Sequence, residues 1–288
     1  MVEPGYMSSE LWKDVLEKIE ETTVSAQYDE PSDYGIDKEI CAIYEKVSLI
    51  LSRYKSGKLP KAFKVIPSLN NWEQLLALTR PAEWTPNATH QATKLFISTL
   101  SPKLASKFCH QVLLPKIQKD FDLNKKVNPH YYQALMLAIS KPSAFFSGIL
   151  LPLCADMRTT QRQAAIMGSV IKKMSIPVLY SAAALIKLTK LDFYGPRAIV
   201  MRTLIEKKYS LPQSALHSLV EFIETSSRCA ENNTVIWQQL VLSVCVKYGA
   251  DLSPLQKSAI IESARRLQHG IITSEIVASI EKTYSILS

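Results

Sequence analysis

The sequence has few of the features that mark secreted, membrane-spanning or metal-binding proteins. Its five cysteines are odd in number and scattered with no CxxC pair, which argues against a disulfide framework or a zinc site. No apolar run reaches the roughly 18 residues that a membrane helix needs. The longest, 145–154, contains Gly148 and Pro152 and is typical of a buried core helix. No basic stretch followed by an apolar one opens the sequence, so we expect no secretory signal and a protein that stays inside the cell.

Glycine is also scarce, and it does not occur where β-hairpins would need it. There are eight glycines, and no Asn-Gly or Asp-Gly dipeptide separates alternating apolar runs. Those dipeptides are the strongest short-range hairpin signal, so the sequence gives hairpins no support. We therefore expect no sheet.

Proline, in contrast, is placed where helices begin. Thr85-Pro86, Ser101-Pro102, Asn128-Pro129 and Ser253-Pro254 each put a side-chain oxygen directly before a proline. The oxygen can cap a helix, and proline at the first helical position loses nothing because its missing N–H would be unpaired there anyway. Four such pairs predict four helix starts.

Apolar residues recur every three or four positions along most of the chain, which is the helical period. The clearest stripes are Ile36-Ile40-Ile43-Val47-Ile50-Tyr54, Ala88-Ala92-Leu95-Phe96, Tyr132-Leu135-Met136-Ile139, Leu216-Leu219-Val220-Ile223 and Ile276-Ile280-Tyr284. Short connections between amphipathic helices favour antiparallel pairs that stack. The sequence predicts an all-α fold, an irregular α-solenoid-like stack of roughly a dozen helices.

Charge divides the chain unevenly. Residues 1–45 hold twelve acidic side chains against three basic ones, and residues 46–288 hold fourteen acidic against thirty-one basic. We expect residues 1–35 to be an acidic N-terminal helix and linker, the helix presenting Leu11, Trp12, Val15, Leu16 and Ile19 to the body or a partner. Residues 36–288 form the basic body, whose charge suits a polyanion such as nucleic acid or is simply a solvated surface.

The residue patterns of known catalytic and metal sites are missing. No two of the five histidines lie three or four positions apart, so no helix face presents a paired metal site. Ser56-Gly57-Lys58 lacks the first glycine and the final Ser/Thr of a phosphate-binding loop. No GxSxG or Gly-rich dinucleotide turn occurs. We expect no catalytic residues, metal or cofactor, no small-molecule substrate and no membrane association.

One segment concentrates the basic charge. Residues 53–67, the basic segment, read RYKSGKLPKAFKVIP, and no carboxylate occurs between Lys46 and Asn71. Pro60 and Pro67 disfavour a long helix, so we expect a mostly extended ribbon. Its proposed contacts to phosphates or to an acidic partner are Arg53, Lys55, Lys58, Lys61 and Lys64. The expected anchors on the body are Leu59, Phe63 and Ile66, with Val65 beside them. The alternative is that the apolar residues pack and the lysines remain solvated.

Three tryptophans of the body raise a related question. Trp72, Trp84 and Trp237 each lie next to a helix start or on an apolar stripe. They could pack in the core or stack on RNA bases. Core packing is the interpretation we adopt.

The basic segment closely resembles the signature of the bystin family, and the likeness continues in the family's order from about Leu51 to about Ile276. Further matching stretches are Asn71-Trp72-Glu73-Gln74, Glu83-Trp84-Thr85, Gln91-Ala92-Thr93-Lys94-Leu95-Phe96, Leu113-Leu114-Pro115, Lys141-Pro142-Ser143-Ala144-Phe145-Phe146, Gly168-Ser169-Val170, Ser175-Ile176-Pro177-Val178-Leu179, Lys207-Lys208-Tyr209-Ser210-Leu211-Pro212, Val235-Ile236-Trp237 and Ser274-Glu275-Ile276. After Leu179 the family pattern has histidine and two serines, and this sequence has Tyr180, Ser181 and Ala182, so it departs at Tyr180 and Ala182. It departs again at Gln238, where the pattern has histidine. Family members also carry a long charged N-terminal region, and only about fifty residues precede the signature here.

The resemblance implies a non-enzymatic ribosome biogenesis factor. It implies binding to precursor small ribosomal subunits in the head and beak region, with support of rRNA processing, maturation and nuclear export. The implied partners are precursor small-subunit rRNA, other assembly factors and a KH-type ribosomal protein of the head. The implied localisation is the nucleus and nucleolus, with shuttling to the cytoplasm on the precursor particle. The rival hypothesis is a generic α-solenoid scaffold that recognises acidic peptides.

Overall fold

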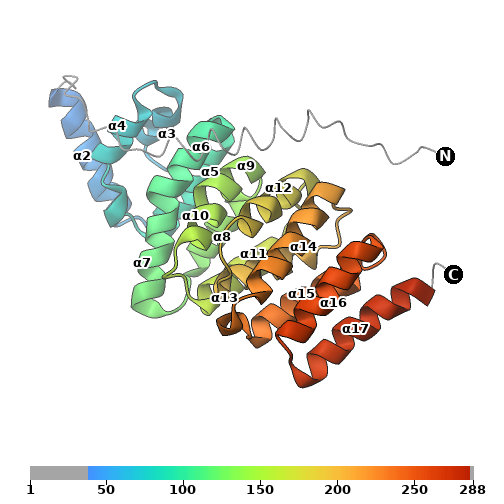
Figure 1. Ribbon diagram of the computed structural model, residues 1–288. Helices are drawn as coiled ribbons and strands as arrows, with labels where there is room; N and C mark the ends of the chain where they lie inside the picture. The colour runs from blue at the N-terminus through green and yellow to red at the C-terminus, as the bar shows by residue number, and fades with distance from the viewer. Residues whose placement is uncertain (1–37, 286–288) are drawn as a thin grey trace, which may run out of the picture. The chain divides into compact units, whose positions relative to one another are not determined.

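The computed structural model describes residues 38–285, and the expected N-terminal helix and linker at 1–35 lie outside them. The described chain is helical almost throughout, and none of its residues belongs to a strand (Figure 1). The all-α prediction is confirmed. Within the same residues no helix is both long and apolar enough to cross a bilayer.

The described residues divide into two compact units, 38–152 and 153–285, a division that the sequence pattern did not indicate. We call them the N-terminal and C-terminal units and describe each separately. The α-helices of the N-terminal unit are α2 (Lys38–Ser52), α3 (Lys61–Val65), α4 (Trp72–Leu78), α5 (Pro86–Thr99), α6 (Pro102–Phe108), α7 (Leu114–Asn124), α8 (Pro129–Ala138) and α9 (Pro142–Phe145). Its other helical turns are the 3₁₀ segments η1 (Ile66–Ser68) and η2 (Pro81–Glu83) and the π segments η3 (Cys109–Leu113) and η4 (Phe146–Leu150).

The boundary between the units falls within α10 (Leu151–Ala155). The remaining elements are α11 (Gln161–Lys173), α12 (Val178–Thr189), α13 (Gly195–Ile205), α14 (Gln213–Ser227), the 3₁₀ turn η5 (Ala230–Asn232), α15 (Val235–Tyr248), α16 (Pro254–Arg266) and α17 (Gly270–Ser285). Contacts link α11, α13, α15 and α17 in sequence, and α12, α14 and α16 likewise (Figure 1). Alternate helices thus form two layers, the arrangement of an α-solenoid.

The four predicted helix starts are confirmed, and each oxygen caps its helix. The hydroxyls of Thr85, Ser101 and Ser253 accept hydrogen bonds from backbone N–H groups three residues on, and the amide oxygen of Asn128 accepts from the second. In each case the proline that follows is the first helical residue. Local chemistry alone therefore fixes where α5, α6, α8 and α16 begin.

The expected buried helix at 145–154 is present, and it widens into a π turn, η4, before Pro152. A second π turn, η3, precedes Pro115 in the same way. Proline has no N–H to donate and its ring crowds the carbonyl four residues earlier, so the wider turn relieves a conflict inside a continuous helix. The helices containing η3 and η4 also pack closely, with the hydroxyls of Ser106 and Ser147 2.9 Å apart.

Aromatic side chains form the centre of the N-terminal unit. The Phe63 ring lies edge-on to Trp84 at 5.3 Å between centroids and contacts Phe96 at 5.8 Å. Phe96 in turn contacts Trp72 at 6.0 Å and stacks on Phe108 at 4.5 Å. Trp72 and Trp84 are buried here, as Trp237 is in the C-terminal unit, so the core-packing prediction is confirmed for all three.

The apolar stripe predicted for α2 matches the face that α2 buries only in part. Tyr44, Val47 and Leu51 are buried, whereas Ile43 and Ile50 are half exposed. The apolar residues of α2 extend around more of the helix than a single packing face, and the contacts with α3 and α4 cover only part of this apolar surface. The periodicity therefore identified the helix and part of its packing face, since Val47 and Tyr54 of the predicted stripe are buried.

Candidate polyanion-binding surface

The basic segment is partly helical, which corrects the prediction of a mostly extended ribbon. After α2 ends at Ser52, the chain runs without regular structure to Pro60, and residues 61–65 then form α3. Gly57 lies five residues beyond the end of α2. It lies in the loop with φ +107°, a conformation that side chains with a Cβ rarely adopt.

The helical turn of α3 decides which side chains face the body. Phe63 and Ile66 are fully buried and Leu59 is half buried, whereas Val65 is exposed. An extended chain, with its period of two, would have placed Phe63 and Val65 on one side. In a helix Val65 instead turns toward solvent with Lys61 and Lys64, because residues three and four apart share a face.

Two side chains at the start of α5 hold the loop in place. The Thr85 hydroxyl donates to the Tyr54 carbonyl at 2.7 Å, and the Asn87 amide donates to the Lys55 carbonyl. The Thr85 N–H also donates to the Leu51 carbonyl at 3.2 Å. Thr85 thus caps α5 and fixes the loop, a second role that sequence reasoning missed because its partners lie more than thirty residues away.

The five candidate cations all point to solvent. Arg53, Lys55, Lys58, Lys61 and Lys64 are exposed, and none forms an ion pair within residues 38–285. The absence of carboxylates between residues 46 and 71 leaves their charge uncompensated along the chain. Such a surface, held on a buried aromatic base, can follow a phosphate backbone without reading its sequence.

Groups that could support metal or thiol chemistry are few in the described chain. No set of three or more potential metal ligands comes together among residues 38–285. Cys109, Cys154 and Cys245 are buried, and burial raises the pKa of each thiol to about 12. They remain protonated at neutral pH and behave as small apolar side chains.

Tertiary structure does bring two histidines together that sequence spacing kept apart. The rings of His90 and His130 lie 6.2 Å apart between centroids, one on α5 and one on α8. Burial lowers the pKa of His90, and the neighbouring His130 and Lys94 lower it further. The neutral form of the His90 imidazole is therefore favoured.

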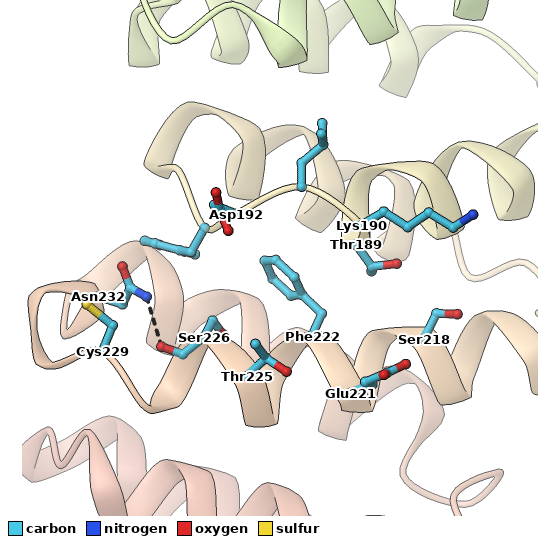
Figure 2. Close-up of a pocket in the computed structure, with 12 residues that line it drawn as sticks. Thr189, Lys190, Asp192, Ser218, Glu221, Phe222, Thr225, Ser226, Cys229 and Asn232 are labelled. Atoms are coloured by element: carbon cyan, nitrogen blue, oxygen red, sulfur yellow. Dashed lines mark hydrogen bonds between the residues drawn. The ribbon is translucent and has the colours of Figure 1, made fainter.

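The C-terminal unit contains a cavity of about 500 Å³ between α14 and the loop after α12. Figure 2 shows Phe222 projecting from α14 toward that loop, with Asp192 and Glu221 among the polar side chains around it. At one end Asn232 donates to the Ser226 carbonyl at 2.8 Å. No histidine lines the cavity, so its hydroxyls have no imidazole base beside them.

The positions that depart from the bystin pattern lie mostly inside the C-terminal unit. Ala182 and Gln238 are buried, and Tyr180 is half buried. The Gln238 amide donates to the Leu267 carbonyl, while its oxygen has no partner among the described residues. These differences therefore change packing and buried hydrogen bonds.

Comparison with known proteins also points to the bystin family, and the match covers more of the chain than the motifs do. The family description "Bystin" matches residues 6–286. The chain is 41% identical to "Bystin" of Homo sapiens over 267 residues, covering 91% of this chain and 61% of that protein. It is 37% identical to "Bystin" of Drosophila melanogaster over 278 residues, covering 94% of this chain and 64% of that protein. The chain thus spans less than two thirds of the length of these relatives, and it belongs to the bystin family.

Proposed function

We propose that this chain binds RNA on precursor small ribosomal subunits through the basic segment and supports small-subunit maturation without catalysing a reaction. The observation that carries the proposal is a set of five exposed cations, none of them ion-paired with a described residue, on a segment whose backbone and aromatic base are fixed to the body. Because the backbone of the segment is already fixed, binding to phosphates costs the conformational entropy of the side chains alone.

The bystin resemblance supplies the context of this proposal. It adds precursor small-subunit rRNA, other assembly factors and a KH-type ribosomal protein of the head as partners. It also adds a role in rRNA processing and nuclear export, and a place in the nucleus and nucleolus with shuttling to the cytoplasm. The head and beak of the particle are the proposed binding region.

The test compares RNA binding by the full chain and a triple variant over a salt series. Changing Lys58, Lys61 and Lys64 to alanine removes three of the five cations. Removing one lysine–phosphate contact reduces the log–log salt slope by about 0.7 for single-stranded and 0.9 for duplex nucleic acid. The slope should flatten by about 2 to 3, measured on overlapping transcripts that cover the precursor rRNA.

A second triple variant controls for net charge. Lys190→Ala, Arg228→Ala and Arg265→Ala remove three exposed cations from the C-terminal unit and should leave the slope close to the parent's. Parallel salt lines for the basic-segment variant and the parent would mean that its lysines are only a solvated face. Saturable binding to an acidic peptide, with no binding to RNA, would favour the scaffold hypothesis instead.

A cellular measurement tests the wider role. The tagged chain should co-sediment with precursor small subunits, and its depletion should lower the ratio of small to large subunits. An unchanged ratio after depletion would contradict a function in small-subunit maturation.

A further inference from the structure

The first helix of the described chain, α2, leaves part of its apolar surface without cover. Ile43 is 49% exposed and Ile50 is 50% exposed, although Val47, between them on the helix, is buried. Residues 43 and 50 are seven apart, two turns of one helical face. α2 lies at the edge of the N-terminal unit with α4 beside it (Figure 1). A stack of helices that ends on an apolar flank needs a covering element with a polar outer face.

Cations border this apolar strip. Lys46 lies between Ile43 and Ile50 at helical spacing, and Arg53 follows just beyond the end of α2. Both are exposed, and neither forms an ion pair with a described residue. One turn before Ile43 the exposed carboxylate of Glu39 lies on the same side, so the cations are concentrated toward the C-terminal end of α2. The element that fits this end of the face is an amphipathic helix with an acidic flank. We call the face, made of Ile43, Lys46, Ile50 and Arg53, the α2 face.

A segment that fits this description precedes α2 in the sequence. Residues 9–19 carry apolar side chains at helical spacing, and the stretch from Glu10 to Glu21 holds five acidic side chains against two lysines. Residues 20–37 connect this segment to α2. Eighteen residues can span about 60 Å, whereas a 15-residue helix is about 22 Å long, so the segment can reach any part of the α2 face.

We propose that residues 9–19 bind the α2 face of their own chain and thereby compete with RNA for the adjacent basic segment. The apolar side chains of residues 9–19 cover Ile43 and Ile50. Their acidic neighbours lie against Lys46 and Arg53, the first cation of the basic segment. Covalent connection gives the segment an effective concentration on the order of millimolar, which favours it over a separate partner. The competition part rests on the proposed RNA binding, but the docking part does not.

Hydrogen–deuterium exchange in the full chain tests docking without RNA. Amides of residues 9–19 should exchange slowly in the parent and at least tenfold faster when Ile43 and Ile50 are both changed to serine. Because these two side chains are already half exposed, the substitutions should leave the fold intact, which far-ultraviolet circular dichroism checks. Leu49→Ser is the matched control, because Leu49 is 61% exposed on the same helix but points about 100° away from Ile50.

RNA affinity tests the competition. If the segment occupies the α2 face nine times in ten, its release in the Ile43/Ile50 variant should strengthen RNA binding about tenfold at constant salt. Leu49→Ser should bind RNA like the parent. An unchanged affinity in the double variant, with exchange at 9–19 accelerated, would overturn competition.

Three exchange results would overturn docking. These are fast exchange at residues 9–19 in the parent, protection that survives in the double variant, and protection that disappears on dilution, which would indicate a second copy as the occupant. A failure of every variant to bind RNA would count against the proposed function and would leave the exchange result to decide docking alone.

Discussion

Truncation of two residues of the same short helix should lower stability by very different amounts, although the prediction of an extended ribbon put both residues against the body. Phe63 is fully buried between Trp84 and Phe96, and Val65 is 50% exposed on the other side of α3. Removing the buried phenyl ring leaves a cavity and ends both ring contacts. Phe→Ala changes in cores cost about 3 to 5 kcal/mol, within which aromatic pairs contribute about 0.5 to 1.5 kcal/mol each. We expect Phe63→Ala to lower the free energy of unfolding by about 4 kcal/mol.

The assay is urea unfolding followed by far-ultraviolet circular dichroism. With a denaturant slope of about 2 kcal/mol per molar, a loss of about 4 kcal/mol moves the midpoint down by about 2 M. Val65→Ala is the control and should cost less than about 1 kcal/mol, because surface substitutions have small effects. Equal costs for the two variants would refute the helical assignment of α3 and restore the extended ribbon. RNA binding by Phe63→Ala should weaken only as the fold is lost.

Two further predictions concern the packing of η3 and η4 in the N-terminal unit. A Cβ at Gly148 would lie 2.5 Å from the Ser106 carbonyl oxygen, so Gly148→Ala should destabilise the chain by about 1 to 3 kcal/mol in the same assay, whereas Gly270→Ala, in open space, should not. Burial raises the pKa of Cys109 to about 12, so the protonated thiol stabilises the fold below pH 9, and this contribution is lost as pH rises from 9 to 12. Near pH 10.5 the loss is about 2 kcal/mol, at 1.36 kcal/mol per pKa unit. The cost of Cys109→Ala should therefore shrink by that amount between neutral pH and pH 10.5. A constant cost for Cys109→Ala would contradict a buried, protonated thiol.

The sequence by itself determined the features that depend on neighbours along the chain. The oxygen–proline pairs at the starts of α5, α6, α8 and α16 predicted those helices because a cap and its N–H groups lie within three residues. The absence of hairpin dipeptides predicted that there would be no sheet, and the position of the tryptophans beside helix starts or on apolar stripes favoured core packing, which the structure confirms. The position of the basic segment, and the absence of acids around it, were also readable from residue order alone.

Only the tertiary structure decided how that segment is held and which of its residues face solvent. Pro60 and Pro67 suggested an extended chain, but a single turn of helix fits between them and buries Phe63 against aromatic rings from α5 and the region before it. Burial of the Phe63 ring stabilises α3, because a helix of only five residues would not be stable by itself. Two contacts join residues that are thirty or more positions apart: the hydrogen bond from Thr85 to the Tyr54 carbonyl, and the contact between the rings of His90 and His130. No local pattern encodes such contacts, because packing between distant helices creates them.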